Sequence, residues 1–197
     1  MKKRIIFPVL IICIIVAAAG LMLFRMRGGV KVMPTEEQSA FAKVISYRQD
    51  DPAWAKDLLG KSEYTMKSSG CLVSCIASAV SDDNVTITPG ELNKLFSDNE
   101  VYDVNGNLQW YKLAEIEGYS VAVYNEVNEA DIEQCLSDGH YPIVRVRMHG
   151  VGNYHYVLIV GKEDGKYICM DPLEDDLTKL SAYGNTVYAV RCVWKEK

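Results

Sequence analysis

The spacing of apolar residues changes along the chain, from helix-like in its first half to strand-like in its second. Residues 71–80 form an apolar run that predicts a short buried helix, and Thr88 before Pro89 is a typical start for the next one. Later runs rich in Val, Ile and Tyr predict strands. The expected helices cover residues 71–80, 91–96, 108–117 and 130–136, and the expected strands cover 119–124, 141–148, 154–162, 166–170 and 186–194. Helices followed by mostly antiparallel strands indicate an α+β domain.

A separate apolar segment precedes this domain. Residues 5–24 carry no charge, and about 20 apolar residues are enough for a helix to cross a bilayer. A cleaved signal peptide has a shorter apolar core; residues 17–19 would suit a cleavage site, but the apolar run continues to Phe24. We therefore expect an uncleaved transmembrane signal-anchor helix over 5–24 that contacts the lipid bilayer. Residues 1–4 are then cytoplasmic, and the domain of this single-pass cell-membrane protein is extracellular.

The rest of the chain divides into a connection and one domain. Residues 25–45 are expected to form a juxtamembrane linker and a helix, because Thr35 and Gln38 fit a capping box. Residues 46–197 are long enough for one domain with its own core.

Composition limits the partners of that domain and leaves its cysteines open. The chain has 26 acidic and 21 basic residues, and several of the basic ones flank the apolar segment. The domain is therefore acidic, which argues against nucleic acid as a partner. Four cysteines lie in apolar surroundings and suit disulfides or buried thiols equally well: Cys75, Cys135, Cys169 and Cys192.

Three residues carry the candidate chemistry. Cys71 opens the helix over 71–80, His155 lies in a predicted strand, and Asp171 ends the next strand. A thiolate is the nucleophile of cysteine hydrolases, and a helix N-terminus and an imidazolium both favour the thiolate form. A carboxylate fixes the tautomer of the histidine and stabilises its charged form. The pattern therefore predicts a cysteine hydrolase.

The predicted hairpin between the two strands tests whether His155 and Asp171 can lie close together. Residues 163–165 suit a three-residue loop with Gly165 in the left-handed conformation, which pairs Lys162 with Lys166. That register places Asp171 on the same sheet face as His155, as a diagonal neighbour about 7–8 Å away. A two-residue loop would shift the register by one and turn Asp171 to the opposite face.

Residues 47–194 resemble the C39-like branch of the papain-like cysteine peptidases. The resemblance rests on four motifs: Gln49-x-Asp51-Pro52-x-Trp54, Ser69-Gly70-Cys71, Gly139-x-x-Pro142-Ile143-Val144, and His155-Tyr156-Val157 with Asp171-Pro172. It implies a papain-like peptidase fold that hydrolyses a peptide or amide bond through a thioester. Cys71 is then the nucleophile, His155 the general base and acid, and Asp171 the orienting carboxylate. The backbone N–H of Cys71 and the side chain of Gln49 are the expected oxyanion donors.

Two departures from the family pattern keep other functions open. Leu72 and Val73 follow Cys71 where many relatives have Gly and Pro, and Thr65 stands where transporter-linked members have Gln. A non-catalytic module that binds a peptide or a cell-wall fragment is one alternative, and a cell-wall amidase or acyl transferase is another. The expected partner is a peptide or cell-wall-derived substrate. No metal or other cofactor is expected, because no second Cys or His pair lies at zinc spacing from Cys71 and Cys75.

Overall fold

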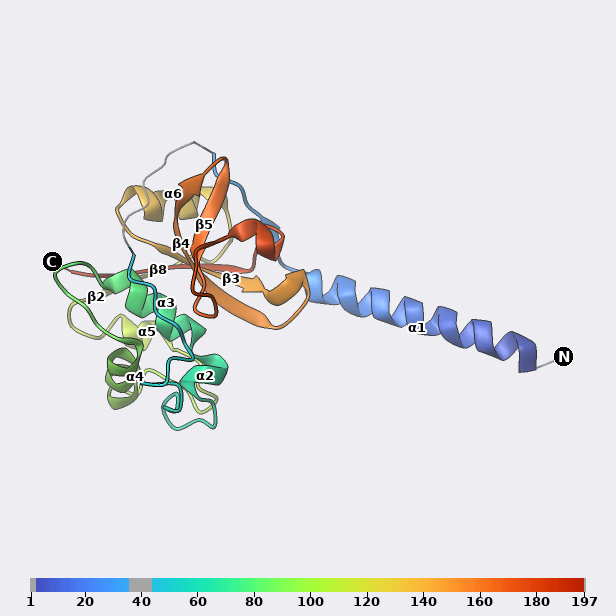
Figure 1. The fold of residues 1–197 in the computed structure, drawn as a ribbon, viewed down its shortest axis with the longest axis horizontal. Coiled ribbons are helices and arrows are strands. Elements are labelled where there is room, and N and C mark those ends of the chain that lie inside the picture. The colour runs from blue at the N-terminus through green and yellow to red at the C-terminus, as the bar shows by residue number, and fades with distance from the viewer. Residues whose placement is uncertain (1–2, 36–43, 197) are drawn as a thin grey trace.

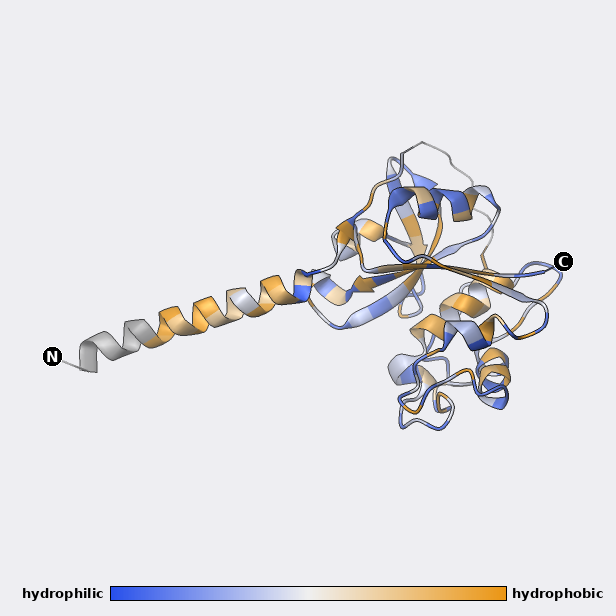
Figure 2. Ribbon diagram, turned by 180° about the vertical axis from the view of Figure 1, so that it is seen from behind, coloured by the Kyte–Doolittle hydropathy of each residue, from blue (hydrophilic) through white to orange (hydrophobic). Residues whose placement is uncertain are grey.

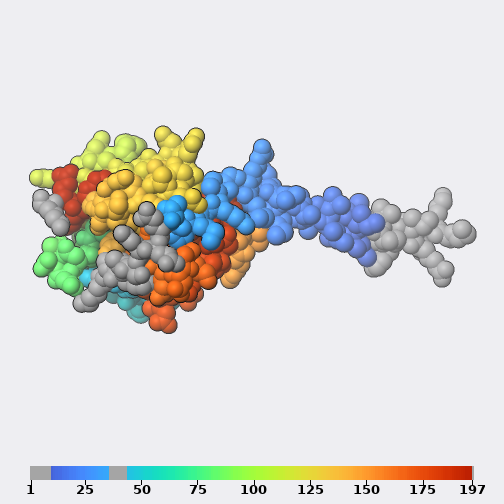
Figure 3. All heavy atoms as spheres, turned by 90° about the horizontal axis from the view of Figure 1, so that it is seen from above, coloured from blue at the N-terminus to red at the C-terminus, as the bar shows by residue number. Residues whose placement is uncertain are grey.

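The computed structural model describes residues 3–35 and 44–196. It consists of a long N-terminal helix, α1 (Lys3–Met26), and a domain that contains all the other elements. Figures 1 and 3 show α1 standing away from the body of the domain. The guanidinium of Arg25, near the end of α1, donates a hydrogen bond to the carbonyl oxygen of Val151 in the domain, at 3.1 Å.

The prediction of a transmembrane anchor over residues 5–24 is wrong. A spanning helix needs about 20 consecutive apolar residues. Within the described residues, no helix combines enough length with enough apolar character to cross a membrane. The part of α1 whose side chains are described, residues 10–26, is mostly apolar and exposed (Figure 2). The single-pass membrane arrangement predicted with this anchor is therefore not supported.

The connection predicted over residues 25–45 is partly docked on the domain. β1 (Val30–Lys31) pairs antiparallel with β7 (Thr186–Val187), and the side chain of Val32 is fully buried. Most of the helix predicted to begin at Thr35 lies outside the described residues, because the description resumes at Val44. Residues 44–48 have no regular structure.

A six-stranded antiparallel sheet forms the centre of the domain, with the order β2-β8-β3-β4-β5-β6. Its strands are β2 (Tyr119–Val123), β3 (Pro142–Arg147), β4 (Tyr154–Glu163), β5 (Lys166–Met170), β6 (Thr178–Lys179) and β8 (Ala189–Lys195). The C-terminal strand β8 inserts between β2 and β3, so the last strand of the chain completes the sheet. The predicted α+β class with antiparallel strands is confirmed.

Short helices precede and connect these strands. They are α2 (Met66–Ser69), α3 (Cys71–Val80), α4 (Pro89–Asp98), α5 (Trp110–Leu113), α6 (Glu129–Ser137), and the 3₁₀ turns η1 (Met148–Gly150) and η2 (Leu180–Tyr183). Thr88 and Glu91 form the capping box that starts α4. Of the helix predicted over 108–117, only α5 is α-helical. Beyond Leu113 the backbone continues in tighter i→i+3 bonds, such as that from the Glu115 N–H to the Lys112 carbonyl oxygen.

Helices cover both faces of the sheet. Figure 1 shows α3 and α6 on opposite sides of it. On one face, Ile76 of α3 and Leu92 of α4 share a core with Leu158 of β4. On the other, Ile132 of α6 shares a core with Ile159 of β4. Because neighbouring residues of β4 enter different cores, this strand is a continuous apolar run and does not alternate with polar residues.

The β4–β5 hairpin differs from its prediction at the loop and agrees with it farther along. Glu163 pairs with Lys166, so the loop has two residues, Asp164 and Gly165, with φ of 51° and 66°. Positive φ at both positions is the geometry of a type I′ turn. A β-bulge between Ile159 and Gly161 then shifts the register by one residue. Beyond the bulge Leu158 pairs with Met170, which is the register that the prediction gave.

One disulfide bond connects α6 to β8. It joins Cys135 to Cys192, which are 57 residues apart in sequence. Cys75 and Cys169 are buried free thiols, so the four cysteines left open by the sequence divide into one disulfide and two unpaired side chains.

We predict that this disulfide is a large contribution to stability. Closing a loop of this length lowers the entropy of the unfolded chain, which corresponds to about 4 kcal/mol. The double variant Cys135→Ser/Cys192→Ser should lose about that much free energy of unfolding in a denaturant titration. A reducing agent should destabilise the native protein similarly and leave the double variant unchanged. Equal stability of the native protein with and without reductant would contradict the prediction.

Candidate active site

Cys71 is the first residue of α3 and lies directly after a one-turn helix, α2. Thr65 and Ser68 form the capping box of α2. Gly70 joins the two helices, and a Cβ atom at that position would collide with the carbonyl oxygen of Met66. The close approach therefore requires glycine, and it presents the half-buried Cys71 at a helix N-terminus. The backbone N–H of a first helical residue has no acceptor within its own helix.

His155 and Asp171 meet inside the domain. The Nε2 atom of His155 lies 2.7 Å from Oδ1 of Asp171. The two residues are 4% and 2% exposed, so solvent does not compete for this contact. The β-bulge in β4 is what places the carboxylate near the ring, because without it a two-residue loop would turn Asp171 to the other face.

Two further donors hold the Asp171 carboxylate. The backbone N–H of Leu173 donates to Oδ1 at 2.8 Å, and the hydroxyl of Tyr183 donates to Oδ2. Burial alone would raise the pKa of Asp171, but the hydrogen bonds from His155, Tyr183 and Leu173 outweigh burial and hold this pKa below its usual value. The carboxylate is therefore charged at neutral pH.

The Cys71 side chain lies on the same cleft as the His155 ring. Burial alone would lower the pKa of His155, but the hydrogen bond to Asp171 and the proximity of the Cys71 and Asp171 side chains raise it to about 9. Because Nε2 is bonded to Asp171, Nδ1 is the ring nitrogen that remains for the sulfur. The structure thus brings together the three residues that the sequence proposed as nucleophile, base and orienting acid.

Gln49 also lies at this site. Its backbone N–H donates to the carbonyl oxygen of Pro172, the residue after Asp171, at 3.0 Å. Its side chain is buried, and Nε2 donates one hydrogen bond to the carbonyl oxygen of Lys67 at 2.8 Å. An amide nitrogen carries two hydrogens, so one N–H of Gln49 remains for another acceptor.

Tyr183 is the site residue that sequence reasoning missed. It ends η2, and its hydroxyl is the donor to Oδ2 of Asp171. The chain contains 12 tyrosines, and no motif distinguishes this one. Only the packing of η2 against β5 brings it to the carboxylate.

Cys71 and His155 line an open cleft of about 800 Å³. Gln49 is on its wall, next to aromatic side chains that include Tyr64, Trp110 and Tyr154. A cleft of this size accommodates several residues of an extended peptide or a ligand of similar bulk. The sulfur is therefore accessible to a substrate, while the His155–Asp171 pair behind it is shielded from solvent.

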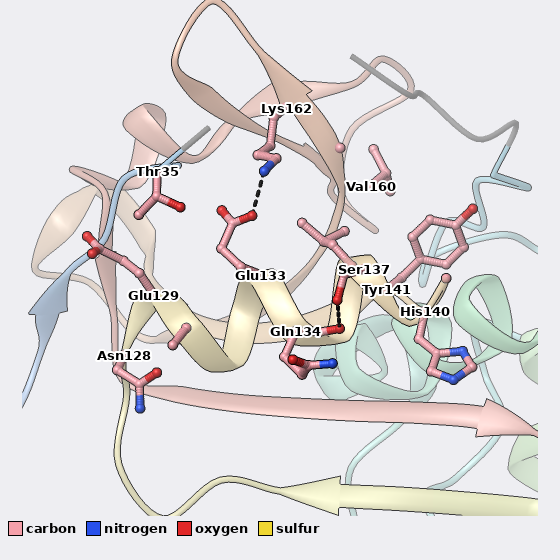
Figure 4. A pocket seen from close by; sticks show the side chains of 14 residues that line it. Thr35, Asn128, Glu129, Glu133, Gln134, Ser137, His140, Tyr141, Val160 and Lys162 are labelled. Carbon is pink, nitrogen blue, oxygen red and sulfur yellow. Dashed lines mark hydrogen bonds and ion pairs between the residues drawn. The ribbon is translucent and has the colours of Figure 1, made fainter. Parts of the chain in front are cut away.

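A second hollow, of about 850 Å³, lies between α6 and β4 (Figure 4). Its charged groups already have partners: Nζ of Lys162 lies 2.5 Å from Glu133, and the Tyr167 hydroxyl donates to the same carboxylate at 2.6 Å. No cysteine lines it. Within the described residues, no group of three His, Cys, Asp or Glu side chains is arranged to hold a metal ion. The candidate residues Cys71 and His155 therefore line the other cleft and not this hollow.

Comparison with known proteins adds no relative to this picture. No family model matches the chain, and no curated protein is significantly similar to it.

We predict that the His155 ring loses its proton at an unusually high pH. Its pKa is raised to about 9, so the ring is protonated at pH 7 and becomes neutral as the pH rises through 9. The C2–H resonance of His155 in an NMR titration should follow this midpoint, and a His155→Gln spectrum identifies the resonance among the three histidines. Asp171→Asn removes a negative charge and should lower the midpoint by about one unit or more. A native midpoint near 6.5 would show that the pair does not form.

Proposed function

We propose that this chain is a papain-like cysteine hydrolase of the C39-like type, which cleaves a peptide or amide bond through a thioester on Cys71. The observation that carries the proposal is the buried contact between His155 Nε2 and Asp171 Oδ1, in a ring that lines the same cleft as Cys71. Cysteine nucleophiles are served by a base that a third group orients, and these three residues have that relation.

The proposed reaction begins with a charged pair. The positive ring of His155 and the N-terminus of α3 both favour the thiolate of Cys71. The thiolate attacks the carbonyl carbon, and the electron pair of the C=O bond moves to its oxygen. The ring then donates its proton to the amine nitrogen, the C–N bond breaks, and an acyl thioester remains on Cys71. Asp171 keeps the ring in the orientation that both steps need.

The second half of the reaction uses the same residues. His155, now neutral, takes a proton from a water molecule, whose oxygen attacks the thioester carbonyl. The C–S bond breaks and the product acid leaves. The thiolate and the protonated ring are thereby regenerated. In both halves the backbone N–H of Cys71 and the remaining N–H of Gln49 are proposed to stabilise the oxyanion. A peptide and a cell-wall-derived amide are both substrates for this sequence of steps.

The disulfide supports a location in an oxidising compartment. Disulfide bonds persist outside the cytoplasm and are rare in reducing compartments. We propose that the domain acts there, where Cys135 and Cys192 remain joined and Cys71 meets its substrate.

A non-catalytic binding module is the second candidate, and the Gln49 side chain favours it. Nε2 of Gln49 already donates to the Lys67 carbonyl oxygen, and its Oε1 is buried without a hydrogen-bond partner. An amide group that is already hydrogen-bonded to the backbone stabilises an oxyanion less than one whose N–H groups point into the cleft without a partner. Such a module would use the same cleft to bind a peptide without cleaving it.

We predict that Cys71 reacts much faster with iodoacetamide at neutral pH than an ordinary accessible thiol. Cys13 on α1 is an exposed free thiol, so it is the internal reference. Mass spectrometry of the alkylated peptides should show Cys71 labelled at least about tenfold faster, and His155→Ala should remove the difference. Equal rates at Cys71 and Cys13 would count against an activated nucleophile.

Peptide cleavage that persists in Cys71→Ser would exclude Cys71 as the nucleophile, whereas no cleavage in the native protein would favour the binding module.

We predict that Tyr183 is a positioning residue for this reaction. Tyr183→Phe removes one donor to Asp171, so the pKa of Asp171 should rise and the acid limb of the kcat/KM profile should move to higher pH. We expect kcat to fall about tenfold with little change in KM, because the hydroxyl is bonded behind the ring and outside the cleft. Tyr188→Phe is the matched control, because the Tyr188 hydroxyl is buried without a hydrogen-bond partner. An unchanged pH profile in Tyr183→Phe would contradict the assignment.

A further inference from the structure

The cleft that contains Cys71 has a charge opposite to that of the chain. The whole sequence has a formal net charge of −5, yet among the described residues no Asp or Glu side chain lines this cleft. Besides His155, its charged side chains are Arg145 and Arg191. A cleft of an acidic protein whose charged lining residues are all positive attracts anions.

The sheet register brings these two arginines together. Arg191 of β8 lies opposite Ile143 of β3, and Arg145 is two residues farther along β3. Side chains two positions apart share a face, so Arg145 and Arg191 are diagonal neighbours. Tyr156 of β4 lies directly opposite Arg145 on the same face.

The Tyr156 side chain connects the arginines to the nucleophile. Burial raises the pKa of Tyr156, the positive charges of Arg145 and Arg191 oppose that rise, and the charge of Cys71 adds to it. Both guanidinium groups and the sulfur are therefore within electrostatic range of the same side chain. Cys75, one turn after Cys71 in α3, also donates to the Tyr156 carbonyl oxygen, at 3.5 Å.

Neither arginine is neutralised by the protein. Within residues 3–35 and 44–196, Arg145 and Arg191 form no ion pair with a carboxylate; Arg191 donates only to the backbone carbonyl oxygens of Tyr124 and Val190, at 3.2 Å and 2.6 Å. Arg145 stacks on Tyr154 at 4.3 Å, and Arg191 lies over Trp110 at 5.5 Å. The Nε atoms of both are buried without a hydrogen-bond partner. Two like charges held near each other in this way are relieved by an anion that binds both.

We propose that Arg145 and Arg191 bind a carboxylate of the substrate beside the bond that Cys71 attacks. This inference rests on the proposed hydrolase function and specifies its substrate class. The carboxylate belongs to an Asp or Glu side chain next to the cleaved bond, or to a free C-terminus. Guanidinium groups suit either source, because their N–H groups match the two oxygens of a carboxylate.

The first test compares two alkylating agents of similar size on the full chain. Iodoacetate is an anion and iodoacetamide is neutral, and each transfers its carbon to the Cys71 sulfur with loss of iodide. In the double variant Arg145→Gln/Arg191→Gln, the rate ratio of iodoacetate to iodoacetamide should fall by about fivefold or more. An unchanged ratio would overturn the proposal.

Arg147→Gln is the matched control for this comparison. Arg147 lies on the same strand as Arg145, its Nε is also buried without a partner, and it stacks on the same ring, Tyr154, at 3.9 Å. Like Arg191, it donates to a backbone carbonyl oxygen, that of Gly152 at 2.8 Å, but unlike Arg145 and Arg191 it does not line the cleft. Its ratio should equal that of the native protein, and a fall as large as in the double variant would contradict a specific site.

The second test uses the native protein, so it does not depend on the folding of any variant. Three otherwise identical peptides are added during alkylation by iodoacetamide: one with an internal Glu and a C-terminal amide, one with Gln and a free C-terminus, and one with Gln and an amide. Slower alkylation of Cys71 with the first peptide supports a side-chain carboxylate, and with the second a terminal carboxylate. Equal protection by all three, or protection by none, would overturn the proposal.

These results separate the subsite from the function on which it rests. If Cys71 reacts no faster than Cys13 in the native protein, the hydrolase proposal fails. If Cys71 reacts fast but the rate ratio of iodoacetate to iodoacetamide is the same in the native protein and in the double arginine variant, the hydrolase proposal stands. Only the carboxylate subsite then fails.

Discussion

The buried contact between His155 and Asp171 is the constraint on which the rest of the site depends. A carboxylate and an imidazole removed from water lose hydration, and that loss must be offset by well-placed hydrogen bonds. Asp171 obtains them from His155, from the Leu173 backbone and from Tyr183. The charged pair is thereby stable inside the domain, where the surroundings keep its geometry fixed.

The site also depends on how the two halves of the domain meet. The sulfur is supplied by α3, while the ring and the carboxylate come from the sheet. The core shared by Ile76, Leu92 and Leu158 holds the helices against one face of β4. Gly70 allows α2 to lie close to the start of α3. The position of Cys71 relative to His155 is therefore a result of packing in the core as well as of local helix geometry.

The sequence predicted the parts of the structure that depend on local pattern. The bounds of α3 follow from an apolar run ended by polar residues, and β4 and β5 follow from continuous apolar runs. The hairpin loop was predicted with three residues and has two, but the bulge near Val160 restored the expected register, in which Leu158 pairs with Met170 and Asp171 lies on the same sheet face as His155. A bulge depends on packing against both faces of a strand, which no local pattern encodes.

Features that depend on tertiary structure were not predictable in the same way. Tyr183 reaches Asp171 only through the placement of η2, and the pairing of Cys135 with Cys192 requires α6 to lie over β8. The predicted membrane anchor over residues 5–24 was wrong, because no described helix has both the length and the apolar character required. The arginines in the cleft were not recognised because strand pairing, not sequence spacing, makes them neighbours.

The central claim is that Cys71 forms a covalent acyl intermediate with the help of His155 and Asp171. Its most direct test is mass spectrometry of the intact protein, quenched in acid shortly after mixing with an activated peptide ester. The account predicts one acyl group per chain, located on Cys71, which disappears as the ester is consumed and forms more slowly in Asp171→Asn. A protein that hydrolyses the ester with no adduct on Cys71, or an adduct that forms equally fast without the carboxylate, would contradict it.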